Sequence, residues 1–116
     1  MGYISTFEYN HSTNFKMKNL KELNEKTKEL SSGMSKATVE EYTSKYGTSY
    51  MIEMNDIVGK FYDDKDYAKL ISKYIETGFI NLLYDGEDGT KLGYRVYPHR
   101  VKELKIELTE TEDIAV

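Results

Sequence analysis

The pattern that most constrains how this chain folds lies toward its C-terminal end, where three strand-like segments follow one another. Residues 79–84 are almost continuously apolar, as in a strand that is covered on both faces. Residues 85–89 hold two glycines among acids and predict a hairpin loop, because glycine adopts positive φ at little cost. Apolar and polar residues then alternate over 91–97 and, after Pro98, over 101–108. This order predicts a three-stranded antiparallel meander.

Two earlier segments show a similar alternation. Residues 2–9 and 48–54 place aromatic or aliphatic side chains on one side and polar ones on the other, which predicts two further strands. A turn after the second of them leads into a short apolar piece over 57–62.

Helical spacing is clearest over 63–77, where apolar side chains recur every three or four residues and form one stripe. The acids at its start complement the dipole of a helix. The residues of the stripe are Tyr67, Leu70, Ile71, Tyr74 and Ile75. A narrower stripe over 17–30 predicts a second helix that packs on one side only.

A third, shorter helix is predicted over 38–46. Thr38 and Glu41 fit a capping box, in which each side chain bonds to the main chain of the other residue. Gly47 can end this helix, because a glycine accepts the left-handed conformation that follows a last turn.

These elements predict an α+β fold, in which a mainly antiparallel sheet of about four to six strands carries two or three helices on one face. Residues 1–108 are expected to form a single domain, since domains commonly span about 50–250 residues. Residues 109–116 are acidic and lack apolar periodicity, so they are expected to be a flexible tail.

Composition excludes several classes of site and of protein. The chain has no cysteine, which excludes disulfides, thiolate metal sites and a cysteine nucleophile. No apolar run approaches the ~18 residues that cross a bilayer, and the start lacks the apolar core of a signal peptide. A cytoplasmic location in a host cell and no contact with a membrane are therefore expected.

The net charge of −4 comes from the second half of the chain, since acids and lysines balance over residues 1–60. The lysines of 16–28 are interspersed with glutamates, which is typical of a solvated helix face. Binding to duplex DNA usually needs a basic stripe that displaces counterions from phosphates. Nucleic acid is therefore not an expected direct ligand.

Two short motifs resemble those of a known group of proteins. Met1-Gly2-Tyr3 opens directly into a strand, and Lys60-Phe61-Tyr62-Asp63-Asp64 leads into the amphipathic helix. The combination resembles a loose group of small phage and prophage proteins that begin Met-Gly-Tyr and carry a Lys-Trp-Tyr-Asp-His segment before such a helix. The match covers the first strand and residues 57–108, but not 17–47, and Phe61 and Asp64 stand where the group has Trp and His. The resemblance implies a mobile-element origin and a non-catalytic role, and anti-CRISPR and related anti-defence proteins share this size, acidity and origin.

Acids beside exposed aromatic side chains are the candidates for partner binding. Carboxylates placed where phosphates would lie can occupy a basic nucleic-acid channel through steering and charge complementarity. Tyrosine is favoured at interfaces because it brings rigid area and a hydroxyl group, and this chain has eleven. The candidates are Asp63, Asp64, Asp66, Asp85, Glu87, Asp88, Tyr62, Tyr94 and Tyr97. The ordinary alternative is that the acids cap a helix and line a solvated turn, while most tyrosines fill half-buried positions of the sheet.

The sequence thus predicts a small acidic phage-type interaction protein that binds and inhibits a host protein or ribonucleoprotein complex, without a cofactor, a metal or catalytic residues. Two alternatives stay open. One is a structural or accessory phage protein that self-associates through the edge of its sheet. The other is a small nucleotide-binding enzyme in which His99, Arg95 and Arg100 form an anion pocket.

Overall fold

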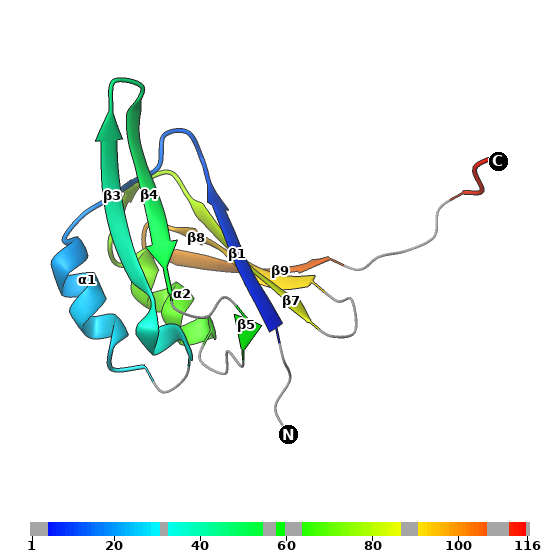
Figure 1. Cartoon of the computed structure of the whole chain (residues 1–116), viewed down its shortest axis with the longest axis horizontal. Helices are drawn as coiled ribbons and strands as arrows, with labels where there is room; N and C mark the ends of the chain where they lie inside the picture. The colour runs from blue at the N-terminus through cyan, green and yellow to red at the C-terminus, as the bar shows by residue number, and fades with distance from the viewer. Residues whose placement is uncertain are drawn as a thin grey trace.

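The computed structural model of this chain describes residues 5–30, 33–54, 58–59, 64–86, 91–106 and 112–115. Within these residues nine strands form three separate antiparallel sheets, accompanied by two short helices and one 3₁₀ turn (Figure 1).

The largest sheet is built around β7, Ile80–Gly86, whose apolar residues suit a central strand. β7 pairs with β1, Ser5–His11, on one side and with β8, Lys91–Tyr97, on the other. β9, Arg100–Ile106, extends the sheet beyond β8, and the two-residue strand β5, Val58–Gly59, borders β1. The strand order is β5-β1-β7-β8-β9, and every pairing is antiparallel. The three C-terminal strands predicted from the sequence are thus present as a meander.

Successive residues of these strands point to opposite faces of the sheet, which we name the core face and the open face. The core face carries buried apolar side chains such as Phe7, Leu82 and Val96. The open face carries the residues between them, among which Asn81 and Arg95 lie directly opposite each other on β7 and β8. Helix α2 packs on β8 and β9 from the side of the core face.

A long β-hairpin forms a second sheet of two strands, β3, Thr38–Ser44, and β4, Gly47–Glu53 (Figure 1). The predicted helix over 38–46 is therefore wrong. Val39 pairs with Ile52 across the hairpin, and both side chains are buried, whereas a helix over the same residues would lack this partner. Gly47 does adopt a positive φ of 124°, but it does so in the hairpin turn.

The two helices are shorter than the sequence predicts. α1 spans Leu20–Thr27 and α2 spans Asp64–Ser72. The start of the first predicted helix and the end of the second are strands instead. They form the third sheet, in which β2, Lys16–Met17, pairs with β6, Ile75–Thr77. This pairing buries Met17 and Ile75 as strand residues rather than as helical ones.

The predicted fold class, two or three helices packed on one antiparallel sheet, is corrected by these findings. Strands predominate among the described residues and are divided between three sheets, and both helices are short. α2 packs on the large sheet, whereas α1 packs on β3, on α2 and on the 3₁₀ turn Gly33–Lys36. The chain is better described as a mostly antiparallel β protein with two short helices.

The core lies between the core face, the two helices and the inner face of the hairpin. Leu23 of α1, Met34 of the 3₁₀ turn and Ile71 of α2 are fully buried there, together with Ile80 and Leu82 of β7. Burial of a large aliphatic side chain stabilises a fold by roughly 1.5–3 kcal/mol. The two small sheets are thus tied to the large one through shared apolar contacts.

Candidate partner-binding site

Among the acidic residues predicted to bind a partner, the structure describes the side chains of Asp66 and Asp85. Asp66 is exposed in α2, on the side of the core face. Asp85 belongs to the open face, where Lys91 Nζ lies 3.5 Å from its carboxylate and 2.8 Å from that of Glu8. The hydrogen bond from Lys91 lowers the pKa of Glu8, as expected for a carboxylate beside a cation. The two described acids therefore project from opposite sides of the sheet, and Lys91 offsets the charge of Asp85.

Tyr62 and the side chains of Asp63, Asp64, Glu87 and Asp88 lie outside the described residues. The patch as a whole stays a prediction.

Tyr94 and Tyr97 lie on opposite faces of the sheet, because they are three positions apart along β8 and side chains alternate between the faces. Tyr94 is on the core face, opposite Glu103 of β9, and Tyr97 is on the open face, opposite Arg100. The two tyrosines therefore cannot contribute to one flat contact surface.

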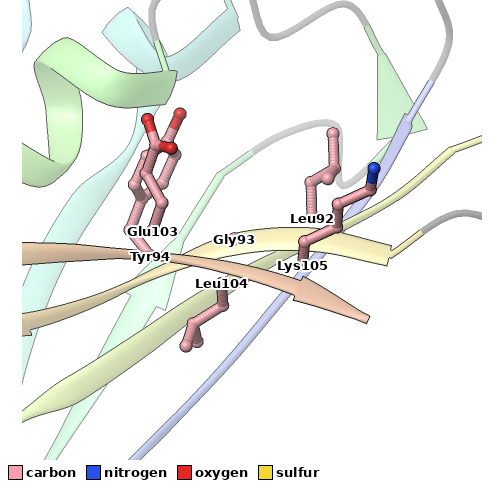
Figure 2. A pocket seen from close by; sticks show the side chains of 6 residues that line it. All are labelled: Leu92, Gly93, Tyr94, Glu103, Leu104 and Lys105. Atoms are coloured by element: carbon pink, nitrogen blue, oxygen red, sulfur yellow. The ribbon is translucent and has the colours of Figure 1, made fainter. Parts of the chain in front are cut away.

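Tyr94 borders a surface hollow of about 400 Å³ on the exposed end of the core face. In Figure 2, Tyr94 and Glu103 stand on one side of the hollow and Leu92 and Lys105 on the other, while Leu104 points away to the opposite face. Glu103 also lies 3.5 Å from Lys65 of α2. The hollow combines one ring, one exposed leucine and both signs of charge.

The main group of exposed apolar side chains lies on the β3–β4 hairpin, where Tyr42 is 43% exposed, Met51 43% and Tyr46 87%. The strand register places Glu40 opposite Met51, and Tyr42 opposite Ser49, on the outer face of the hairpin. We name this surface, made of Glu40, Tyr42, Met51 and Glu53, the outer hairpin face. Its apolar area and its two carboxylates are contiguous.

The hydroxyl group of Tyr42 joins the acids of the outer hairpin face. It lies 2.6 Å from Glu40 Oε2 and 3.2 Å from Glu53 Oε1, and it donates its one hydrogen to these carboxylates. The hydrogen bond to Glu40 raises the pKa of Tyr42 to about 12, because the negative carboxylate favours the neutral phenol. The ring is thus held beside the two acids instead of rotating freely.

The hairpin is anchored through its inner face. Val39, Tyr50 and Ile52 are buried there against the core. The Tyr50 hydroxyl accepts a hydrogen bond from the main-chain N–H of Met17 at 3.0 Å and donates one to Glu41 Oε1 at 2.9 Å. The desolvation of the hydroxyl raises the pKa of Tyr50.

Asn24 of α1 anchors the hairpin from the side. Its side chain accepts a hydrogen bond from the Val39 N–H at 2.8 Å and donates one to the Val39 carbonyl oxygen at 3.1 Å. The amide therefore takes the place of a neighbouring strand at the outer edge of β3. The base of the hairpin is fixed, while its far end, with Tyr46 at the turn, extends into solvent (Figure 1).

A sequence signal for this site did exist. Residues 38–44 are rich in β-branched and aromatic types, and two residues separate them from the strand at Gly47. Two strand-like runs separated by two residues are typical of a hairpin. The capping-box pattern at Thr38 indicates a helix over the same residues. The hairpin forms because β3 pairs with the strand that carries Tyr50 and Ile52.

The two histidines lie in different environments. His11 Nδ1 is 2.8 Å from the Ser12 carbonyl oxygen, and its ring stacks on Phe15 with 5.0 Å between centroids. His99 is exposed in the β8–β9 turn, with a positive φ of 54°. Among the residues that the structure describes, no group of three or more His, Asp and Glu side chains is arranged to hold a metal ion.

In the described part of the chain no helix combines the length and the apolar character that crossing a membrane requires. Comparisons of the sequence and structure with protein-family models, curated proteins and solved structures found no match.

Proposed function

We propose that this protein binds a basic surface of a macromolecular partner through the outer hairpin face. One observation carries the proposal: Tyr42 and Met51 expose apolar area directly beside the carboxylates of Glu40 and Glu53. Tyrosine and methionine are enriched at the centres of protein interfaces, and acids around them select a positively charged partner.

The way the hairpin is held supports this role. Binding costs free energy for each side chain that it immobilises, roughly 0.5–1.5 kcal/mol. The Tyr42 ring is already oriented by two carboxylates, and Asn24 and Tyr50 fix the strands beneath it. A surface that is ordered before binding loses less conformational entropy on binding, so more of the energy of its contacts contributes to affinity.

The resemblance of the sequence to small phage proteins supports a host complex as the partner. Under this proposal the protein is an inhibitor of the anti-defence kind, and its carboxylates occupy a site where the host protein binds phosphates. This is the mechanism predicted from the sequence, with different residues: Glu40 and Glu53 take the place of the acids near residues 63–66 and 85–88.

The test is affinity capture from a lysate of the host cell with three forms of the protein. Wild type, Tyr42→Ala/Met51→Ala and a control pair of exposed residues that follow α1, Lys28→Ala/Glu29→Ala, are immobilised at equal density. The proposal predicts at least one host protein that wild type and the control retain and the hairpin variant loses. Circular dichroism of all three forms confirms that they are folded.

Once that protein is identified, its affinity for the single variants measures the site. Tyr42→Ala is expected to weaken binding by about 2 kcal/mol or more, as for a residue at the centre of an interface. Glu40→Lys should mainly slow association, because exposed charges steer encounter. Retention of the same host proteins by the hairpin variant and by wild type would contradict the proposal.

A further inference from the structure

A second unusual surface lies on the open face of the large sheet, at the end near the β8–β9 turn. Three cations and two rings meet there. Arg95 lies directly opposite Lys102, and Tyr97 directly opposite Arg100, so these four side chains share the face. Phe79 joins them, with its ring centroid 5.7 Å from that of Tyr97. We name Phe79, Arg95, Tyr97, Arg100 and Lys102 the cation–aromatic patch.

Each guanidinium group of the patch is placed over a ring. Arg95 Cζ lies 4.7 Å from the centroid of Phe79, and Arg100 Cζ lies 5.6 Å from that of Tyr97. Cation–π contacts of this kind hold a cation in position without neutralising its charge. The patch is therefore partly ordered and keeps its positive potential.

Arg95 is the most firmly placed of the three cations. Its Nε donates a hydrogen bond to Asn81 Oδ1 at 2.8 Å, and Asn81 Nδ2 donates one to Asn10 Oδ1 at 2.7 Å. This chain of bonds crosses three strands and uses only Nε of the guanidinium group. The two terminal nitrogens donate to no described residue, so their hydrogen bonds remain available to an anion.

The positive charge of the patch is not offset within the described residues, where no carboxylate forms an ion pair with Arg95, Arg100 or Lys102. In contrast, Lys91 on the same face is paired with Glu8 and Asp85. Three cations within two adjacent strands make a local positive region on a chain whose net charge is −4.

We infer that the cation–aromatic patch binds single-stranded nucleic acid. Proteins that bind single strands combine cations along the backbone path with rings on which bases stack, and guanidinium planes serve the same purpose. The half-buried rings of Phe79 and Tyr97 and the three cations supply both parts on one open sheet face. A duplex keeps the faces of its bases stacked inside, and the carboxylates of an acidic peptide do not stack on rings, so neither uses the aromatic half of the patch.

This inference goes beyond the proposed function and differs from the expectation that nucleic acid is not a direct ligand. That expectation rested on the absence of a basic run in the sequence. Arg95, Arg100 and Lys102 do not form such a run, and the antiparallel pairing of β8 with β9 brings them together.

The experiment is fluorescence anisotropy of labelled oligo(dT) and oligo(U), each about 20 nucleotides long and thus longer than one typical site. The full chain is titrated at about 50 mM salt and at higher salt, because contacts to phosphates weaken as salt rises. For three phosphate contacts, log K should fall with log salt at a slope of about −2. The two oligonucleotides show whether the patch prefers DNA or RNA, and a duplex of the same length should bind more weakly.

Three variants test the residues. Tyr97→Ala should weaken binding roughly 5- to 100-fold through lost stacking, whereas Tyr97→Phe should bind like wild type. Arg100→Glu/Lys102→Glu should weaken it further and reduce the slope to about −0.7, that of one remaining contact. The matched control Lys28→Glu/Lys36→Glu reverses two exposed charges away from the patch and should leave affinity and slope unchanged.

Polyglutamate as a competitor separates nucleic acid from a general anion. If it displaces the oligonucleotide as well as unlabelled oligo(dT) does, and Tyr97→Ala has no effect, the patch binds acidic protein and the inference is wrong. Absence of binding by wild type at low salt, or equal binding by the charge-reversal variant and the control, would overturn it as well. The hairpin variant Tyr42→Ala/Met51→Ala should bind the oligonucleotide normally, so this result is independent of the proposed function.

Discussion

Tyr42, Tyr50 and Tyr67 show how differently this chain uses one residue type. The hydroxyl of Tyr50 is buried and bridges Met17 and Glu41, so that the side chain joins two segments. The hydroxyl of Tyr42 faces solvent beside two carboxylates. Tyr67 is fully buried, and its hydroxyl has no hydrogen-bond partner among the residues that the structure describes. Abundance of tyrosine alone therefore does not mark an interface.

Tyr67→Phe is expected to stabilise the protein. A buried polar group without a partner costs about 1–3 kcal/mol, and phenylalanine has the same ring without the hydroxyl. Burial raises the pKa of Tyr67, which is consistent with a hydroxyl far from solvent. Urea unfolding should show a gain of about 1 kcal/mol or more in the free energy of unfolding. A loss of stability would mean that the hydroxyl has a partner after all.

The titration of Tyr42 provides a second test at this scale. Its pKa of about 12 in the folded protein lies above the ordinary value of about 10, so the neutral phenol is favoured by folding. The resulting stabilisation is present below pH 10 and is lost as the pH rises toward 12. The difference in phenolate absorbance between wild type and Tyr42→Phe should report a group that titrates near 12. Glu40→Gln/Glu53→Gln should move this titration back toward 10, and an unchanged midpoint would show that the two acids do not cause the shift.

At the scale of elements, the β3–β4 hairpin depends on contacts that come from distant parts of the chain. β4 is joined to Met17 through Tyr50, and β3 is joined to α1 through Asn24. A two-stranded hairpin alone is marginally stable in water. The hairpin is therefore ordered by the elements beneath it, and its base and its far end should differ in stability.

Asn24→Ala should loosen the hairpin. The substitution leaves the main-chain N–H and carbonyl of buried Val39 without partners, which should cost about 1–3 kcal/mol. Asn24→Asp keeps the acceptor for the N–H and should have a smaller effect. The exposed neighbour Glu25→Ala is the control and should change stability by less than about 0.5 kcal/mol. Hydrogen exchange at the Val39 N–H should be faster in the alanine variant than in wild type, and equal protection of this N–H in all forms would contradict the role of Asn24.

β9 is an edge strand of the large sheet, and it bears on the alternative that the protein self-associates through a sheet edge. Lys102, Glu103 and Lys105 are exposed along it, and charged side chains on an edge strand oppose pairing with a second copy. We therefore expect a monomer of 13.5 kDa in size-exclusion chromatography with light scattering. A dimer that Val101→Lys or a proline in β9 dissociates would favour self-association instead.

At the scale of the whole molecule, charge is separated between two surfaces. The outer hairpin face carries carboxylates with exposed Tyr42 and Met51, and the open face of the sheet carries the cation–aromatic patch. The hairpin packs through its inner face on the core, so the two surfaces are available at the same time. Under the two proposals made above, a ribonucleoprotein partner would contact the outer hairpin face with its basic protein and the cation–aromatic patch with its nucleic acid.

The predicted division into a domain over 1–108 and a tail over 109–116 gives a test at the same scale. Residues 112–115, the described part of the tail, are exposed, and Ile114 is 86% exposed. Deleting 109–116 should therefore change the melting temperature by less than about 2 °C, since few buried contacts are lost. A fall of more than about 5 °C would mean that the tail packs on the domain.

The sequence by itself determined the elements whose pattern and partner are both local. The meander of β7, β8 and β9 could be predicted because each strand carries its own alternation and pairs with the next in the chain. The middle of α2 could be predicted from its stripe, and Tyr67 and Ile71 are indeed fully buried. In these segments local preference and tertiary contacts favour the same structure.

Tertiary structure decided the rest. Residues 38–44 became a strand because Val39 and Ile52 bury each other and Asn24 completes the edge, and none of these partners is visible from the local pattern. The same holds for the ends of both predicted helices. Met17 and Ile75 fit the helical spacing, but they pair with each other as strand residues. The outer hairpin face and the cation–aromatic patch follow the same rule, because strand pairing creates the neighbours that a linear sequence keeps apart.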